Sequence, residues 1–397
     1  MRRKKPFISP ACASLPCSRG GRIARAAAAW ETVGQYNRPD CVIAMTRLGR
    51  KEMGDNVRTV RAGLVGLGRF GKLHAAVLAS LPGAQLAAIC DPDAVELDRV
   101  GDRYGIAHRF GSYADFLAHA DVDCVFLVTP EPLHAEQALQ AIERGWPVFL
   151  EKPLATTAAE GERVAMAARS AGVPLHVGFV LRFETRYALL KQAVDQGRFG
   201  KIITARVKRN VSKAWFEVYG DRAHAVHETA IHDIDVLLWL LQDRCTTVYA
   251  VQRHVSSRRF PDATVALLQF ASGAVAVVET SWFVPARGPA NVLAEAWHGT
   301  IDAEMELVGT ERTARLRGLE TGLEIWTDDV IAVPDPGLWP EVHGRIGGAL
   351  RDEDAHFIEC VRSGRPSAIT SVDDAVTGLR IAEAIIASAE QGREVGL

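Results

Sequence analysis

Hydrophobic residues between positions 60 and 179 fall into short β-rich runs that alternate with stretches of helical periodicity. The runs predict strands at residues 60–65, 85–90, 124–128, 148–150 and 175–179. The stretches between them predict helices at residues 72–80, 94–104, 113–118, 133–144 and 158–171. Because strands that alternate with helices favour a parallel sheet with crossover helices, we predict an α/β domain over residues 57–181.

The pattern changes after residue 182, where the β-rich segments are longer and several follow one another directly. They lie at residues 202–208, 246–253, 264–270, 274–282, 303–308 and 313–317. Ser272 and Gly273 separate two of them and predict a hairpin. We therefore predict an α+β domain with a largely antiparallel open sheet over residues 182–397. One face of this sheet should be covered by predicted helices at residues 229–241, 352–362 and 372–391. The other face should pair with a second subunit.

Residues 1–52 differ from the rest of the chain, with eleven Lys or Arg against three acidic residues and little apolar periodicity. We expect them to lie outside the fold, as a disordered basic extension or as sequence upstream of a true start at Met45 or Met53. Their Arg, Ala and Ser content leaves a transit peptide open. A twin-arginine signal at Arg2 and Arg3 is disfavoured, because prolines interrupt any apolar run after it.

The composition argues against several classes of partner. A formal net charge of -2 argues against nucleic acid, and no apolar run approaches the roughly 20 residues that cross a bilayer. The seven cysteines are scattered, odd in number and without a CxxC pair. We therefore expect a cytoplasmic protein with no nucleic-acid or membrane partner.

A glycine-rich loop, Gly66–Gly71, joins the first predicted strand to the first helix with the spacing GxGxxG. In such a loop the first glycine makes a tight turn, the second lets a pyrophosphate approach and the third allows close helix packing. Asp91 ends the next strand about twenty residues later, where a carboxylate takes ribose hydroxyls. Because that carboxylate repels a 2'-phosphate, we expect NAD rather than NADP, although Arg69 keeps NADP open.

Two later strand ends carry further candidate residues, in the segment 129–134 (TPEPLH) and in Glu151-Lys152-Pro153. Ligands of open α/β sheets bind beyond the carboxyl ends of the strands, so these loops should line the cofactor crevice. The domain over 57–181 is thus predicted to be a Rossmann dinucleotide-binding domain. The residues expected to bind NAD are Gly66, Gly68, Arg69, Phe70, Gly71, Asp91, Thr129, Pro130, His134, Glu151 and Lys152.

These loops, followed by an antiparallel domain, resemble the Gfo/Idh/MocA family of glucose-fructose oxidoreductase, inositol dehydrogenase and rhizopine-catabolism proteins. The resemblance extends from about residue 60 to the C-terminus. It implies that Lys152 projects toward the reacting carbon near the nicotinamide and that Pro153 follows a cis peptide bond. One position departs from the family, since Glu131 stands where Asn is common.

A second group of candidate residues lies on the predicted helix at 229–241 and just before it. Glu228, His232 and Asp235 share one helical face, and burying them would be unfavourable unless they are paired or used. The family pattern implies that His232 is catalytic, with Glu228 where Asp is more usual. Alternatively, His232 is a structural histidine, and Glu228 only favours the helix dipole near an N-terminus capped by Thr229. No third ligand accompanies the His–Asp pair, so we expect no metal.

A cluster near the end of the predicted strand at 202–208 mixes polar donors with aromatic faces, and its members are Lys208, Arg209, Asn210, Trp215 and Tyr219. Such a mixture suits a hydroxyl-rich ligand, although a solvated strand edge is an equal alternative. The expected substrate contacts are Lys152, Arg182, Lys208, Asn210, Trp215, His232 and Asp235.

We therefore predict an NAD(P)-dependent dehydrogenase that acts on a CH–OH group of a sugar or inositol-like polyol. His232 would accept the hydroxyl proton, Lys152 would hydrogen-bond the same oxygen and Glu228 would hold the His232 ring. The second domain would form a dimer or tetramer through its sheet. Two other functions remain open, an NAD-using glycoside hydrolase and a ligand-sensing protein without turnover.

Overall fold

A computed structural model describes residues 58–256, 258–294 and 297–397 of the chain. The extension expected at residues 1–52 lies outside the described residues, as does residue 57, where the first domain was predicted to begin. Within the described part of the chain, no helix is both long and apolar enough to cross a membrane.

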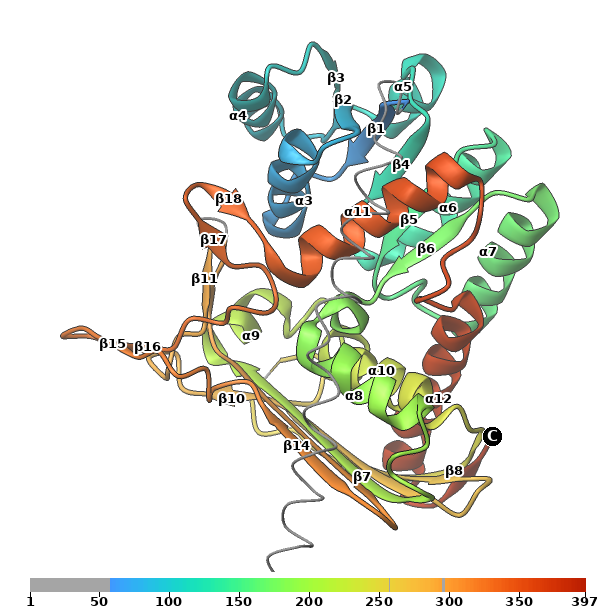
Figure 1. Ribbon diagram of the computed structural model, residues 1–397, viewed down its shortest axis with the longest axis vertical. Helices are drawn as coiled ribbons and strands as arrows, with labels where there is room; N and C mark the ends of the chain where they lie inside the picture. The colour runs from blue at the N-terminus through green and yellow to red at the C-terminus, as the bar shows by residue number, and fades with distance from the viewer. Residues whose placement is uncertain (1–57, 257, 295–296) are drawn as a thin grey trace, which may run out of the picture. The chain divides into compact units, whose positions relative to one another are not determined.

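The first domain contains a six-stranded parallel sheet with the order β3-β2-β1-β4-β5-β6 (Figure 1). The five predicted strands are confirmed as β1 (Val60–Val65), β2 (Ala84–Cys90), β4 (Cys124–Leu127), β5 (Val148–Glu151) and β6 (Leu175–Gly178). The short strand β3 (His108–Phe110) was not predicted, because none of its three residues is buried. The strand order reverses between β1 and β4, and a crevice opens at such a switch point.

Helices connect these strands in the predicted alternation. They are α3 (Arg69–Ser80), α4 (Ala94–Tyr104), α5 (Tyr113–His119), α6 (His134–Glu143) and α7 (Ala158–Ala171). Local sequence signals fix several ends. The side chains of Asp93, Ser112 and Thr157 accept hydrogen bonds from backbone amides at the starts of α4, α5 and α7. Left-handed glycines end α4 and α7 at Gly105 and Gly172.

The second domain is built on a seven-stranded sheet with the order β14-β13-β7-β10-β9-β8-β19. β7 pairs with β10 in parallel, and the other neighbours are antiparallel. The predicted, largely antiparallel sheet is therefore confirmed, and Gly273 (φ 90°) makes the predicted hairpin between β9 and β10. The strands are β7 (Ile202–Ser212), β8 (Cys245–Arg253), β9 (Ala263–Phe270), β10 (Val275–Val284), β13 (Ile301–Gly309), β14 (Thr313–Arg317) and β19 (Val395–Gly396).

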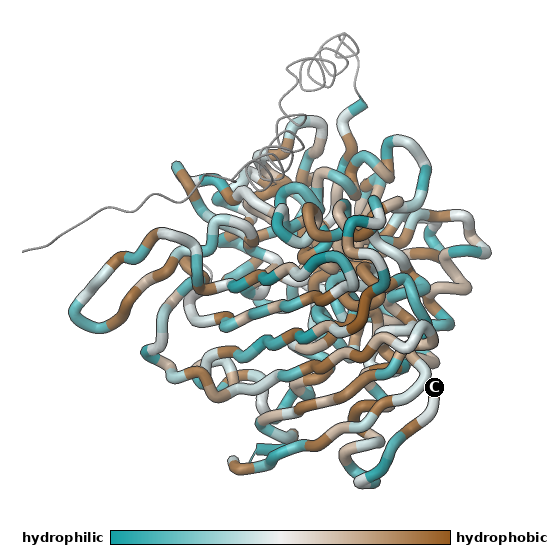
Figure 2. The backbone as a smooth tube through the Cα atoms, turned by 60° about the horizontal axis from the view of Figure 1, so that its bottom comes forward, coloured by the Kyte–Doolittle hydropathy of each residue, from teal (hydrophilic) through white to brown (hydrophobic). Residues whose placement is uncertain are grey.

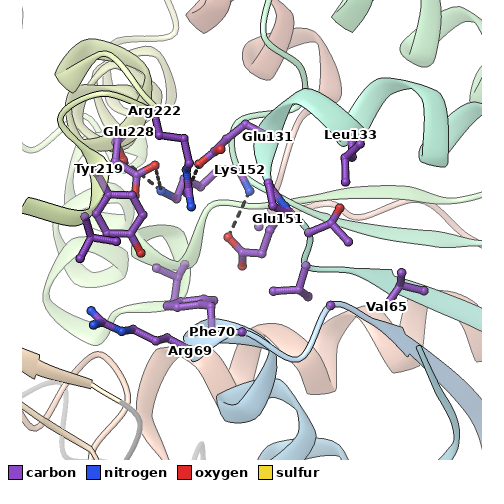
Figure 3. A pocket seen from close by; sticks show the side chains of 18 of the residues that line it. Val65, Arg69, Phe70, Glu131, Leu133, Glu151, Lys152, Tyr219, Arg222 and Glu228 are labelled. Carbon is purple, nitrogen blue, oxygen red and sulfur yellow. Dashed lines mark hydrogen bonds and ion pairs between the residues drawn. The ribbon is translucent and has the colours of Figure 1, made fainter. Parts of the chain in front are cut away.

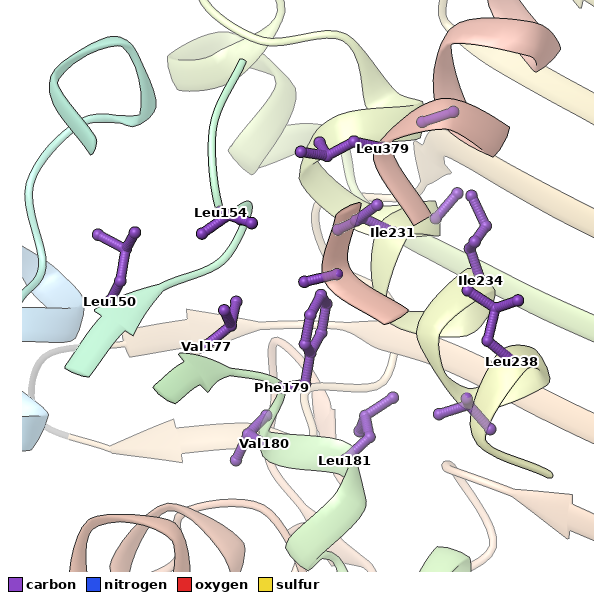
Figure 4. Packing of buried hydrophobic residues seen from close by; sticks show 14 of the residues in the cluster. Leu150, Leu154, Val177, Phe179, Val180, Leu181, Ile231, Ile234, Leu238 and Leu379 are labelled. Carbon is purple, nitrogen blue, oxygen red and sulfur yellow. The ribbon is translucent and has the colours of Figure 1, made fainter. Parts of the chain in front are cut away.

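Hydrophobic and polar residues alternate along the strands of this sheet, as Figure 2 shows. The buried face packs on α10 (Ile231–Leu241) and α12 (Val372–Gln391), whose apolar residues also meet the ends of β5 and β6 (Figure 4). One continuous core therefore joins the two sheets through these helices. The opposite face exposes apolar side chains, at Tyr249, Val251, Val265 and Leu267.

Helix α11 (Gly348–Ser363) corrects one expectation, because it was predicted to cover the second sheet. It packs on the first sheet instead, where the Phe357 ring meets those of Phe126 and Phe149 at 5.1 and 5.6 Å. His74 of α3 contacts Asp354 of the same helix at 2.9 Å. An amphipathic pattern predicts a buried helical face but does not say which sheet receives it.

The remaining elements are short and lie mainly in the second domain. The helical ones are η1 (Glu131–Leu133), η2 (Val180–Phe183), α8 (Thr185–Asp195), α9 (Lys213–Tyr219) and a π-helical turn, η3 (Val226–Ala230). The strands are β11 (Val292–Ala294), β12 (Trp297–Gly299), β15 (Ile325–Trp326), β16 (Ile331–Ala332), β17 (Glu341–Val342) and β18 (Arg345–Ile346).

Candidate active site

A cavity of about 840 Å³ lies at the carboxyl ends of the first sheet and is closed on its other side by residues of the second domain (Figure 3). It is the place at which an open α/β sheet binds its ligand. Among the predicted site residues, those that line it are Gly66, Gly68, Arg69, Phe70, Asp91, Thr129, Pro130, Glu151, Lys152, Trp215, Glu228 and His232.

The glycine loop has the geometry of a phosphate cradle. Gly66 has φ 93°, and a Cβ there would lie 2.3 Å from the carbonyl oxygen of Val128. A Cβ on Gly71 would lie 2.0 Å from the Gly66 oxygen, so the helix can approach the strand this closely only with glycine. At Gly68 a Cβ would meet nothing within 4 Å, which leaves this backbone open toward the cavity. These positions fit the pyrophosphate of a dinucleotide at the start of α3.

Asp91 stands beside this loop at the end of β2. Its two carboxylate oxygens accept hydrogen bonds from the amides of Leu67, at 2.6 Å, and Asp93, at 2.8 Å. A carboxylate has about four acceptor positions, so two remain for ribose hydroxyls. The amides fix Asp91 at the edge of the cavity.

His134 does not line the cavity, although we expected it to bind the cofactor. Its ring is fully buried, with Nδ1 2.7 Å from the Pro153 oxygen and Nε2 2.8 Å from the Thr129 oxygen. Burial lowers the pKa of this ring, and the two carbonyl oxygens oppose that shift. His134 therefore ties the loop after β4 to the loop after β5, and both loops line the cavity.

Lys152 enters the cavity from the end of β5, next to a cis peptide bond before Pro153, as the resemblance implied. Its Nζ donates to the Glu228 carbonyl oxygen at 3.0 Å and lies 3.4 Å from Glu228 Oε2. Burial alone would lower the pKa of Lys152, but the carboxylates of Glu228, Glu151 and Glu131 raise it. Lys152 is thus held as a cation that bridges the two domains.

His232 lines the same cavity from the first turn of α10. Its pKa is lowered well below the ordinary value, first by burial and then by the positive charges of Lys152 and Arg209. The ring is therefore neutral near pH 7 and can accept a proton. Its Nδ1 has no hydrogen-bond partner among the described residues.

Glu228 differs from the expectation that it holds the His232 ring. It lies in the π-helical turn before α10, and its contacts are with Lys152 instead. Burial raises the pKa of Glu228, and Lys152 opposes that shift. Thr229 does not cap the helix, because its hydroxyl donates to the Ala225 oxygen at 2.7 Å. The sequence pattern predicted one regular helix over 229–241 and gave no sign of this π-helical turn before it.

Glu131, the departure from the family pattern, forms an ion pair with Arg222 at 2.7 Å. Burial alone would raise the pKa of Glu131, but Arg222 holds it below the usual value. Figure 3 shows this pair beside that of Lys152 and Glu228. Two opposite-charge contacts therefore cross from the first domain to the second at the cavity.

Four predicted substrate contacts lie away from the cavity. Arg182 forms a buried ion pair with Asp235, at 2.6 and 2.8 Å, and also contacts Asp374 of α12. Lys208 pairs with acidic residues of β13, and Asn210 donates to Glu279 of β10. The alternation of side chains along β7 explains why Lys208 and Asn210 lie away from the cavity. Arg209, between them in the sequence, points to the buried face and lines the cavity.

The wall from the second domain also contains residues that the sequence analysis did not select. Its aromatic members are Trp215 and Tyr219, which belong to the cluster expected to suit a hydroxyl-rich ligand, and Trp282 and Trp339, which were not selected. Trp282 follows the buried positions of β10 in strict alternation, which is a signal that could have identified it. Arg222 lies in an irregular loop and carried no such signal.

Comparison with known proteins agrees with the fold. Residues 60–179 match an oxidoreductase family with an NAD-binding Rossmann fold, and residues 187–315 match the GFO/IDH/MocA C-terminal domain. Inositol 2-dehydrogenase 3 of Saccharopolyspora erythraea is 36% identical over 264 residues, which are 65% of this chain and 73% of that protein.

Two further proteins match over most of the chain. The scyllo-inositol 2-dehydrogenase (NAD(+)) of Bacillus subtilis is 29% identical over 349 residues, or 85% of this chain and 96% of that protein. The crystal structure of apo scyllo-inositol dehydrogenase from Lactobacillus casei has a TM-score of 0.73 at 25% identity, and the match covers 86% of this chain and 99% of that one. The predicted fold and family are both confirmed. The chain belongs to the GFO/IDH/MocA family of oxidoreductases, with an NAD-binding Rossmann domain.

Proposed function

We propose that this enzyme oxidises a secondary hydroxyl of an inositol-like cyclic polyol or sugar, with NAD as the hydride acceptor. The observation that carries the proposal is that a cationic Lys152 and a neutral His232 line one cavity with the open glycine loop. The relatives named above are inositol dehydrogenases, which supports a polyol as the substrate. They also favour a dehydrogenase over a glycoside hydrolase or a ligand sensor.

Three residues of the chain carry out proton transfer and orient the reacting hydroxyl. A ring nitrogen of neutral His232 accepts the proton of the reacting hydroxyl. Lys152 Nζ donates a hydrogen bond to the same oxygen and stabilises the negative charge that develops there. Glu228 keeps Lys152 protonated and fixes its position from the second domain. When bound, NAD supplies the hydride-accepting ring.

Cofactor choice is assigned to Asp91. Its carboxylate is fixed by two amides at the edge of the cavity, where the adenosine ribose of a dinucleotide on the glycine loop would lie. A fixed negative charge there repels a 2'-phosphate. The position of Asp91 therefore supports NAD in preference to NADP.

We propose that the protein forms a homo-oligomer through the exposed face of the second sheet. This face carries Tyr249, Val251, Val265 and Leu267. Adjacent exposed apolar residues on an open sheet favour burial against a second copy. A cytoplasmic location is supported by the buried free thiols, which are Cys90, Cys124, Cys245 and Cys360.

Replacing His232 by Ala should lower kcat by ~10²–10⁴-fold, because the base is lost, and Lys152→Ala should act similarly. The dissociation constant for NAD, measured by fluorescence titration, should stay within about threefold, because neither change touches the glycine loop. Lys208→Ala is the matched control and should keep its turnover, because Lys208 lies outside the cavity. If His232→Ala keeps more than about a tenth of the turnover, His232 is not the base.

Glu228→Gln should move the basic limb of the kcat/KM profile to lower pH. Glu228 raises the pKa of Lys152, so its loss lets Lys152 lose its proton at lower pH, and activity is lost with that proton. Glu228→Asp keeps the charge and should shift the limb less. Identical basic limbs for wild type and Glu228→Gln would show that Glu228 does not control Lys152.

Asp91→Ser should lower the ratio of kcat/KM for NAD over NADP by on the order of tenfold, because the charge that repels the 2'-phosphate is gone. Asp93→Ser is the matched control, because Asp93 caps α4, serine caps equally well and Asp93 does not line the cavity. An unchanged ratio in Asp91→Ser would place the ribose elsewhere.

A further inference from the structure

The part of the cavity that faces Lys152 and His232 is lined chiefly by aromatic and aliphatic side chains. They come from α9, β10, β13 and the segment before α11, and include Trp215, Tyr219, Trp282, Ile301, Leu338 and Trp339. Lys208 and Asn210, which could have bound hydroxyls, face the opposite side of the sheet. The wall is therefore much less polar than the sequence suggested.

This aromatic wall is held in place by ring stacking. Trp282 is 1% exposed, and its ring stacks with two rings of α9. The ring centroids of Trp282 and Phe216 are 5.7 Å apart with an interplanar angle of 24°, and those of Trp282 and Tyr219 are 6.3 Å apart with an angle of 18°. Trp339 meets Phe70 edge to face at 5.2 Å. Rings fixed in this way offer a preformed apolar surface, so a ligand that binds there orders little of the protein.

Three polar side chains of the same wall already have partners. Arg209 donates to Asp233 at 2.8 and 3.0 Å, and Arg222 pairs with Glu131. The Thr229 hydroxyl is bonded within its own turn and to β10.

A few polar groups are left for a ligand on this side of the cavity. Beyond Lys152 and His232, the Tyr219 hydroxyl lies on this wall. The Trp282 indole nitrogen is covered by protein atoms, so a ligand does not reach it. The site therefore offers hydrogen bonds for two or so oxygens and apolar contact for the rest of the ligand.

A free cyclitol matches such a wall poorly. It carries a hydroxyl on every ring carbon, and each one buried without a partner weakens binding. An alkyl or aryl substituent, by contrast, gains affinity from every apolar contact that it makes with the wall.

From this mismatch we infer that the substrate is a polyol ring that bears an apolar substituent, such as an ether or an alkyl or aryl glycoside. The inference rests on the proposed function and narrows its substrate class. The reacting hydroxyl lies at Lys152 and His232, and the substituent packs on Trp215 and Trp339.

The test compares matched pairs of ligands, D-glucose with phenyl β-D-glucopyranoside and myo-inositol with a mono-O-methyl ether. Binding is measured by calorimetry on the NADH-loaded wild-type enzyme, which cannot oxidise an alcohol, and turnover by NADH formation from NAD. The substituted member of each pair should bind at least tenfold more tightly than the free one. Equal or weaker binding of the substituted members overturns the inference.

The two measurements separate this inference from the proposed function. Tighter binding of the substituted ligands without NADH formation from any of them supports the apolar site and contradicts the dehydrogenase. NADH formation that is most efficient with free inositol supports the dehydrogenase and contradicts the apolar site.

Discussion

The contact between Lys152 and Glu228 is the interaction on which the rest of the site depends. Lys152 follows β5 of the first domain and Glu228 precedes α10 of the second, so their contact forms only when both sheets and α10 are in place. Away from water an unpaired ammonium would lose its proton. The pair therefore keeps Lys152 positive, and that charge in turn helps to keep His232 neutral. One ion pair thus contributes to opposite protonation states in two neighbouring groups, with burial as the larger cause for His232.

Most of the fold could be predicted from the sequence because its signals are local. The glycine loop, the caps of the first-domain helices and the alternation of β9 and β10 each identify an element without reference to distant residues. One error arose where a distant partner decides the outcome. Helix α11 returns to the first sheet, and its amphipathic pattern does not specify that partner.

The candidate site was predicted less completely, for similar reasons. The residues at strand ends were found, because the switch point of an open sheet fixes their location. The substrate side depends on which face of β7 is buried, and a choice of Lys208 and Asn210 instead of Arg209 selects the wrong face. The turn that brings Glu228 to Lys152 is π-helical, and simple helical periodicity has no signal for it. Arg182 and Asp235 looked like ligand contacts because a buried ion pair and a binding site use the same residue types.

A crystal structure with NADH and the polyol that the enzyme oxidises fastest would test the central claim most directly. The account predicts one ligand oxygen within about 3.2 Å of both Lys152 Nζ and a His232 ring nitrogen, beside the nicotinamide of a cofactor whose pyrophosphate lies on the glycine loop. A ligand whose oxygens contact neither nitrogen, or a Lys152 that leaves Glu228 to bind elsewhere, would contradict it.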